Sequence, residues 1–374
     1  MKNPLNKRLF RELKSEIGKY LVIFLLLTGT IGFVSGFLVA DGSMIKAYEE
    51  GFEKYNIEDG NFRLGNKMNR AQRKNIEQLG ITLYDNYYIE KKLTNDSTLR
   101  IFQNREQVNQ VCLMSGKMPE KTGEIAIDRM YADNNQIQVG DILISDDCFW
   151  TVTGLVALPD YSCLFSDNND SMFDAVKFGV SVVTEEEFAG FDEDMLSYSY
   201  SWKYENPPKD EKQEKEMSED LMEGMNGEVV LEDYIPCFQN QAIQFTGDDM
   251  GSDKAMMIAL LYIVIGIMAF VFGITISNTI SKEANVIGTL RASGYSKTEL
   301  ILHYMTMPFV VTLAGAIVGN ILGYSVMKDI CAGMYYGSYS LTTYVTIWNG
   351  EAFLLTTVVP VLMMMAINYL VLRH

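Results

Sequence analysis

Histidine, the residue used most often for general acid–base catalysis, is scarce in this chain, and the spacing of the other reactive residues matches no catalytic pattern. The only two histidines are His303 and His374, so the long hydrophilic stretch from residue 41 to 253 contains none. Histidine-dependent catalytic triads and histidine-based zinc sites are therefore excluded from that stretch. The Gly-Lys pairs at residues 18 and 116 are followed by Tyr20 and Met118 instead of Ser or Thr. The chain thus lacks the P-loop motif that binds the phosphates of ATP.

One acidic loop resembles the start of a calcium-binding loop. It runs from Asp167 to Ser171, but Met172 stands where such a loop needs glycine and Phe178 where it needs a bidentate glutamate. A solvated turn is the better interpretation. We therefore expect no catalytic, cofactor-binding or metal-binding residues, and a protein that is not an enzyme.

Four uncharged stretches of about 20 residues or more are each long enough to cross the hydrocarbon core of a membrane. We predict an α-helical membrane protein whose spans are residues 20–40, 255–280, 304–327 and 352–372. Six Lys and Arg residues precede the first span, against two Glu, and this excess predicts a cytoplasmic N-terminal segment, residues 1–19. Both termini and residues 281–303 are then cytoplasmic, and residues 41–253 and 328–351 lie outside. The first span could also be read as a signal peptide, but its length favours a retained helix.

The region 41–253 is expected to form a mixed α/β extracytoplasmic domain. It holds 42 Asp and Glu against 19 Lys and Arg, which excludes a nucleic-acid-binding surface. A helix is expected to continue from the first span through residues 42–55. Short apolar runs bounded by turn residues predict strands at Ile81–Ile89, Leu99–Phe102, Glu124–Asp128, Ile142–Ile144, Trp150–Leu158 and Phe178–Val183. The charged run from Pro207 to Gly224 is typical of an exposed helix or a mobile insertion.

The five cysteines, residues 112, 148, 163, 237 and 331, all fall on the predicted outer side, where disulfides can persist. Their spacing gives no connectivity, and a set of free, buried thiols is an equally good interpretation. The loop 328–351 is rich in Tyr and Trp, which favours an aromatic belt at the membrane boundary over a substrate platform.

The segment after the second span has an unusual pattern. Glu283, Ile287, Leu290 and Arg291 recur at helical spacing, so an acid, a base and apolar groups are expected on one face. Gly294 is typical of a helix end, and Ser296 with Glu299 forms a capping box for the next helix. We predict a helix, a break and a short helix at the inner membrane surface, which could insert into a cleft of a partner protein.

This segment resembles the cytoplasmic segment of the FtsX-like, MacB-type ABC transporter permeases. The residues that carry the resemblance are Glu283, Ile287, Gly288, Thr289, Leu290, Arg291, Ala292, Gly294, Tyr295 and Leu300. Residues 116–160 look like the extracytoplasmic core domain of the same family, and the order of one helix, a large domain and three helices is similar to MacB-like architecture.

The resemblance implies a permease subunit of the mechanotransmission type. A separate ABC ATPase subunit, which holds ATP and Mg, would dock on the coupling region from Glu283 to Gly294, and two permease subunits would pair as a homo- or heterodimer. The resemblance also implies the plasma membrane of a bacterium and an amphiphilic substrate such as a peptide, a lipid-like molecule or a lipoprotein. The chain has no fused ATPase domain, and it could be half of a longer permease.

The spans contain small residues at four-residue spacing: Gly32 and Gly36 in the first, and Gly315, Gly319 and Gly323 in the third. Such faces allow close helix approach, either between two subunits or within one. The spans contain no charge, which argues against an ion pathway and a secondary transporter. Two alternatives remain. One is a signalling scaffold that acts through an extracytoplasmic protein partner, such as a cell-wall hydrolase or a sensor kinase. The other is a membrane receptor without ATPase.

Overall fold

The structure is a computed structural model that describes residues 14, 16–145 and 148–373 of the 374-residue chain. These residues divide into two compact units. The helical unit comprises the described residues up to Met44, Met250–Met334 and the residues from Val345 on. The α/β domain comprises Ile45–Asp249 and Tyr335–Tyr344.

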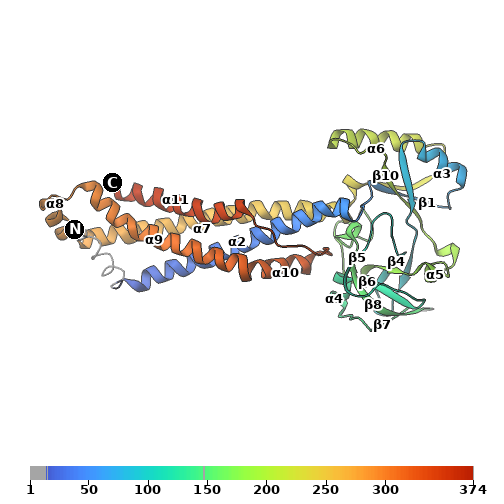
Figure 1. Ribbon diagram of the computed structural model, residues 1–374, viewed down its shortest axis with the longest axis horizontal. Helices are drawn as coiled ribbons and strands as arrows, with labels where there is room; N and C mark the ends of the chain where they lie inside the picture. Colours follow the sequence, from blue (N-terminus) through green and yellow to red (C-terminus); the bar gives the residue numbers. More distant parts are fainter. Residues whose placement is uncertain (1–13, 15, 146–147, 374) are drawn as a thin grey trace. The chain divides into compact units, whose positions relative to one another are not determined.

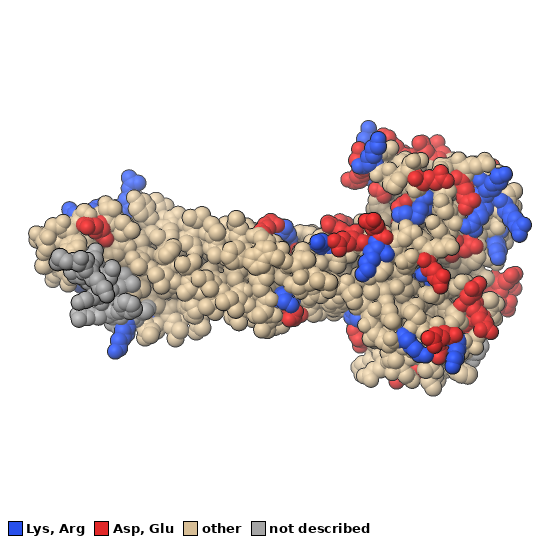
Figure 2. Space-filling model, in the orientation of Figure 1, with Lys and Arg blue, Asp and Glu red and all other residues tan. Residues whose placement is uncertain are grey.

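Four helices are long and apolar enough to cross a membrane, and each contains one of the four predicted spans (Figure 1). They are α2 (Ile17–Lys54), α7 (Gln241–Lys282), the helix Lys297–Ser338, which begins with α9 (Lys297–Leu322), and α11 (Gly350–Arg373). Helix α9 continues through a π-helical segment, η4 (Gly323–Met327), into α10 (Lys328–Ser338), so the helix extends beyond the predicted end of the third span. On the face drawn in Figure 2, charged side chains cluster over the α/β domain and are sparse along the helices.

The core of the helical unit is apolar and draws on all four helices. Ile31, Leu261, Ala316 and Ala352, one from each helix, are fully buried in one cluster. Many other apolar side chains of the same helices, such as Ile263 and Leu362, are more than half exposed. A helix that is hydrophobic all round suits a membrane environment, where lipid covers the outward side chains.

The glycines of the first and third spans lie where α2 contacts α9 and its continuation through η4 into α10. A methyl group added at Gly32 would lie 3.2 Å from the carbonyl oxygen of Gly319, and one at Gly315 would lie 3.2 Å from Cβ of Leu27. At Gly36 and Gly323 the added carbon would come within 2.5 Å of Met327 Cβ and 2.7 Å of Ser35 Cβ. These contacts are within one chain, and they explain why glycine is needed at these positions.

A polar network joins three helices inside the helical unit. The side-chain oxygen of Asn320 accepts hydrogen bonds from Ser35 Oγ and Thr356 Oγ1, both at 2.8 Å, and its amide donates to Thr357 Oγ1 at 3.0 Å. All groups of the Asn320 side chain are thus satisfied internally, as burial away from water requires.

The α/β domain contains two sheets. The first has the order β11-β1-β10-β2 and is antiparallel throughout, with β1 (Gly60–Leu64), β2 (Ile81–Asp85), β10 (Tyr198–Tyr204) and β11 (Leu231–Pro236). Its core contains Phe62, Tyr200 and Trp202, each at most 1 % exposed.

The second sheet is mixed and has the order β3-β4-β9-β6-β8-β5, with β7 paired to β8. The strands are β3 (Tyr88–Lys92), β4 (Thr98–Gln103), β5 (Cys112–Gly116), β6 (Glu124–Asp128), β7 (Ile142–Ile144), β8 (Phe149–Ala157) and β9 (Phe178–Val183). The β4–β9 and β6–β8 pairs are parallel. The remaining elements of the domain are α3 (Arg70–Glu77), α4 (Arg129–Asn135), α5 (Glu185–Phe188), α6 (Glu211–Met225), η1 (Pro159–Tyr161), η2 (Glu193–Met195) and η3 (Cys237–Gln239).

The expected strands agree with the structure except for one. The prediction of a single strand at Ile81–Ile89 is wrong, because β2 ends at Asp85 and pairs in the first sheet, whereas β3 begins at Tyr88 and pairs in the second. Asn86 lies between them and is fixed by a hydrogen bond from its amide to Ser201 Oγ. The predicted helix after the first span is confirmed to Lys54, and the charged run after Pro207 forms helix α6.

All five cysteines are free thiols in the structure, and four of them are buried. Two aromatic residues of the expected membrane-boundary belt, Tyr335 and Tyr339, are only 5 % and 6 % exposed and belong to the α/β domain. There, Arg129 donates hydrogen bonds to the carbonyl oxygens of Tyr336 and Tyr339. Trp348, in contrast, is 68 % exposed.

Candidate functional site

The segment between α7 and α9 folds as a short separate helix, α8 (Ala284–Ala292). Helix α7 ends at Lys282, and the chain breaks at Glu283, whose carbonyl oxygen accepts the first hydrogen bond of α8 from the Ile287 amide at 2.9 Å. The prediction included Glu283 in the helix and placed its end at Gly294, so the break at Glu283 was not expected. In Figure 1, α8 lies at one end of the helical unit, near the end of α11.

The end of α8 has the geometry of a Schellman motif. The Tyr295 amide donates to the Leu290 carbonyl oxygen, and the Gly294 amide donates to that of Arg291, both at 3.1 Å. Gly294 has φ +97°, in the left-handed region that glycine adopts without a steric cost. The expected helix end at Gly294 is therefore confirmed, and its physical reason is this backbone conformation.

The start of α9 is fixed by the expected capping box. Ser296 Oγ accepts a hydrogen bond from the Glu299 amide at 3.2 Å, and the Glu299 carboxylate accepts one from the Ser296 amide at 2.8 Å. The hydrogen bonds that the amide and the hydroxyl of Ser296 donate to the Glu299 carboxylate hold the pKa of Glu299 below its usual value. The turn from α8 into α9 is thus defined at both ends by local hydrogen bonds, which fixes the position of α8 on the helical unit.

The surface of α8 is open. None of its residues is buried, and Gly288, Arg291 and Ala292 are exposed, whereas Ile287, Leu290 and Tyr295 are half-buried. A β-carbon added at Gly288 would have no atom within 4 Å. Nothing else in the described structure therefore requires glycine there, although it costs about 1 kcal/mol in a helix interior. An exposed glycine of this kind allows close approach of another surface.

Arg291 carries the charge on the open surface of α8. One of its terminal nitrogens donates to the Tyr295 carbonyl oxygen at 3.2 Å, and it forms no ion pair within the described part of the chain. Most of its five N–H groups therefore remain available to a carboxylate of another molecule.

Glu283 occupies a different place from the one expected. It precedes α8 instead of sharing a face with Arg291, because the helix breaks at this residue. Its carboxylate accepts a hydrogen bond from the hydroxyl of Tyr304, on α9, at 2.8 Å. Tyr304 was not among the residues predicted for this site. The pattern of the sequence gave no sign of it, since it is 21 positions away along the chain.

A small cavity of about 110 Å³ lies beside this hydrogen bond. It is lined by residues of α7 and α9 and by two from the N-terminal part of the chain: Ile276, Thr279, Lys282, Glu283, His303, Tyr304, Met307, Glu16 and Tyr20. Glu283 and Tyr304 thus lie where the α7–α8 break faces α9. The described residues contain no group of three or more His, Cys, Asp or Glu side chains that could hold a metal ion.

The helical C-terminal part of the chain matches the model of one known protein family. Residues 258–374 match the model described as FtsX-like permease C-terminal. The matched region includes α8, α9 and α11 in full. No curated protein matches the chain.

Proposed function

We propose that the chain, whose residues 258–374 match the FtsX-like permease C-terminal model, is an ABC-transporter-type permease subunit and is of the mechanotransmission type. In this proposal a separate ABC ATPase subunit, which binds ATP and Mg, docks on α8 and the turn that follows it. Closure of the ATPase moves α8, and the motion reaches the α/β domain through α7, which begins in that domain and ends at α8.

The observation that carries the proposal is the short exposed helix between two candidate spans. No residue of α8 is buried, so the whole helix is accessible to a partner protein. Ile287 and Leu290 supply a half-buried apolar edge, Arg291 supplies the charge, and Gly288 allows close approach. Gly294 adopts the left-handed conformation of the turn after α8, and the Tyr295 amide donates the hydrogen bond to Leu290 that completes this turn. Glu283 and Tyr304 connect the docking element to α9.

The charge pattern supports the orientation that this mechanism needs. Lys and Arg residues concentrate in the segment before the first span, and Arg373 lies at the end of the last one, so both ends of the chain are proposed to be cytoplasmic. The α/β domain is then outside the plasma membrane of a bacterium. There it would act, with a second permease subunit, in the export or extraction of an amphiphilic substrate.

Substitutions in α8 test the proposal. We expect Arg291→Ala and Gly294→Val to lower the ATPase activity of the purified complex by about tenfold or more. The first removes a charge-assisted contact, and the second forces a β-branched residue into a left-handed conformation. Arg70→Ala, an exposed arginine on α3, is the matched control. Wild-type ATPase activity and normal function in cells for both α8 variants would refute the coupling role.

A further inference from the structure

The chain between α10 and α11 leaves the helical unit and packs into the α/β domain. Residues 335–344 belong to that domain, whereas the chain up to Met334 and from Val345 on belongs to the helical unit. Four residues of this loop are at most 6 % exposed: Tyr335, Tyr339, Ser340 and Leu341. Such burial is unusual, since connecting segments run mostly over the surface of a protein. We call residues 335–344 the docked loop.

Arg129, the first residue of α4, holds the backbone of the docked loop. One of its terminal nitrogens donates to the carbonyl oxygens of Tyr336 and Tyr339, at 2.9 and 2.7 Å. The guanidinium also lies over the Tyr336 ring, 5.0 Å from its centroid, and its other terminal nitrogen pairs with Asp133 at 2.8 Å. The Arg129 side chain is only 14 % exposed, so these charge-assisted hydrogen bonds lie in a region of low dielectric and are strong.

The side chains of the docked loop bind the end of β6 and the start of α7. The Ser340 hydroxyl donates to the carboxylate of Asp128, the last residue of β6, and the Tyr339 hydroxyl donates to the carboxylate of Asp249 on α7. The Tyr339 ring also lies beside that of Phe245, with centroids 6.5 Å apart. The loop is therefore fixed through its side chains as well as its backbone.

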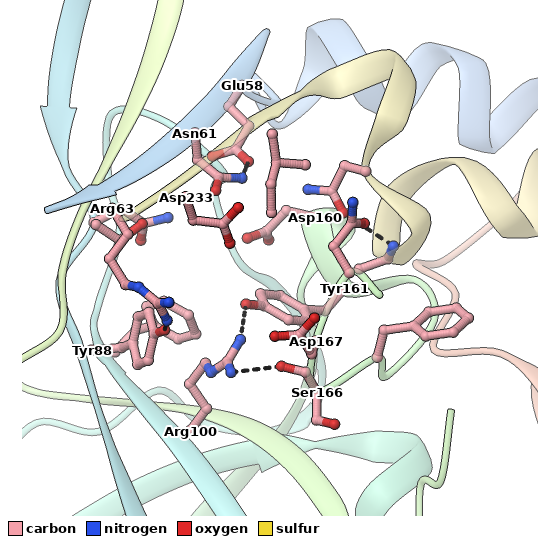
Figure 3. Close-up of a pocket in the computed structure, with 18 residues that line it drawn as sticks. Glu58, Asn61, Arg63, Tyr88, Arg100, Asp160, Tyr161, Ser166, Asp167 and Asp233 are labelled. Carbon is pink, nitrogen blue, oxygen red and sulfur yellow. Dashed lines mark hydrogen bonds between the residues drawn. The ribbon is translucent and has the colours of Figure 1, made fainter. Parts of the chain in front are cut away.

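A further hydrogen bond joins the docked loop to the segment after β8. The Ser340 amide donates to the Ser162 carbonyl oxygen at 2.8 Å. This segment is itself fixed to the second sheet, because Arg100 of β4 donates to the Tyr161 hydroxyl and to the Ser166 carbonyl oxygen, both at 2.8 Å, at the wall of a polar cavity of about 90 Å³ (Figure 3). A displacement of the docked loop would therefore act on β4 and β6 together.

The connection between α10 and α11 is longer than a link between two helices needs. It runs from Tyr339 to Asn349, whereas helix–helix connections in bundles usually have about two to eight residues. Helices α2 and α7 already join the two units, crossing from one into the other at Ile45 and Met250. Two such attachments still leave rotation about the line that joins them, and a third attachment restricts it.

We propose that the docked loop is a third attachment of the α/β domain to the helical unit, positioned by Arg129, and that it restricts movement of the domain. Within the proposed function, α10 and α11 then move the domain together with α7. The attachment itself does not depend on an ATPase.

Hydrogen exchange of the full-length protein in detergent tests whether Arg129 holds the loop. We expect the amides of residues 335–344 to exchange at least about tenfold faster in Arg129→Ala than in the wild type, because loss of charge-assisted hydrogen bonds makes local opening more frequent. Peptides from β9 should exchange as before. Arg129→Lys, which keeps a charged donor, should give an intermediate rate. Arg70→Ala, at an exposed arginine of α3, should match the wild type.

Spin labels test whether the loop restricts the domain. One label is placed at Glu186→Cys on α5 and the other at Leu362→Cys on α11, both exposed positions, in a cysteine-free background. We expect the distribution of label-to-label distances, measured by pulsed EPR, to become at least about twofold broader when Arg129→Ala is added. Tyr339→Phe changes only the loop and keeps the ring beside Phe245, so it should broaden the distribution in the same direction.

Three results would overturn the proposal. They are loop exchange as fast in the wild type as in Arg129→Ala, an unchanged distance distribution although the loop is released, and equal broadening in Arg70→Ala. If Arg129→Ala lowers the melting temperature of the domain, Tyr339→Phe decides the test, because it leaves the residues on the domain side intact. Neither measurement contains an ATPase, so their failure is distinct from failure of the proposed function.

Discussion

The Glu283–Tyr304 hydrogen bond is a side-chain link between the α7–α8 break and α9. A hydrogen bond to a charged group contributes about 1.5–3 kcal/mol. If it fixes the angle of α8, Tyr304→Phe should lower ATP hydrolysis by the complex several-fold while assembly is retained. Adding Glu283→Gln should cause little further loss, because both changes remove the same bond.

The control for this pair is Tyr262→Phe, which removes a hydroxyl from α7 for which the structure gives no hydrogen bond. Additive losses in the double variant would show that Glu283 and Tyr304 act separately, contrary to the account.

Asp128 gives the α/β domain a characteristic pH dependence. Its carboxylate is fully buried, accepts hydrogen bonds from the Tyr131 amide and the Ser340 hydroxyl, and burial raises its pKa from 3.8 to about 6. A raised folded-state pKa means that stability is full below pH 4 and falls as pH rises through about 6. The difference between these two pKa values corresponds to about 3 kcal/mol.

We therefore expect the stability of the wild type relative to Asp128→Asn to decrease as pH rises from about 4 to 6. Thermal unfolding of each protein at several pH values, monitored by tryptophan fluorescence, measures this difference in stability. The signal reports on the domain because Trp150 and Trp202 are fully buried in it. Glu58 has a raised pKa in both proteins and does not affect the comparison. Parallel pH profiles for the two proteins would be inconsistent with a raised Asp128 pKa.

At the scale of elements, the α2–α9 contact depends on the absence of side chains. Gly36→Ala would place a carbon 2.5 Å from Met327 Cβ and 2.9 Å from the Lys328 amide nitrogen, which is backbone and cannot move freely. We expect a loss of about 1–3 kcal/mol from overpacking. A thermal stability assay in detergent should show a lowered midpoint.

Gly266→Ala, on α7, is the matched control, because an added β-carbon there has no atom within 4 Å. It should leave the midpoint unchanged. Equal midpoints for Gly36→Ala and Gly266→Ala would mean that the α2–α9 contact is looser than the structure indicates.

Elements with local signals could be predicted from the sequence, and elements set by distant contacts could not. Gly294 and the Ser296–Glu299 pair determine their turn through hydrogen bonds within a few residues, so their types and spacing were sufficient. The division of Ile81–Ile89 into two strands depends on different partners, β10 for one and β4 for the other. The residue pattern within Ile81–Ile89 does not indicate which sheet each half of the segment joins.

The same reasoning applies to the candidate site and to the docked loop. The α8 region is contiguous, and its residue pattern identified it, although the position of Glu283 depended on a break that helical periodicity does not reveal. The docked loop finds its partners Arg129, Ser162 and Asp249 in segments far apart in the chain. The sequence predicts a membrane-boundary belt for the aromatic residues of this loop, because the residues that they contact cannot be inferred from the loop itself.

For the molecule as a whole, the account predicts that the α/β domain and α8 lie on opposite sides of the membrane. Two single-cysteine variants, Lys209→Cys in the domain and Ala292→Cys in α8, replace exposed side chains in a cysteine-free background. A membrane-impermeant maleimide should label Lys209→Cys in intact cells and Ala292→Cys only after permeabilisation. Labelling of both in intact cells would contradict the topology.

We propose that this protein works with a separate ATPase held by α8. Purification of the tagged chain from its native membranes in mild detergent, with identification of the proteins recovered and assay of ATP hydrolysis, tests it most directly. The account predicts recovery of a P-loop ATPase with wild-type α8 and its loss with Arg291→Ala and Gly294→Val combined. A preparation without ATPase under several solubilisation conditions, or recovery that does not depend on α8, would contradict it.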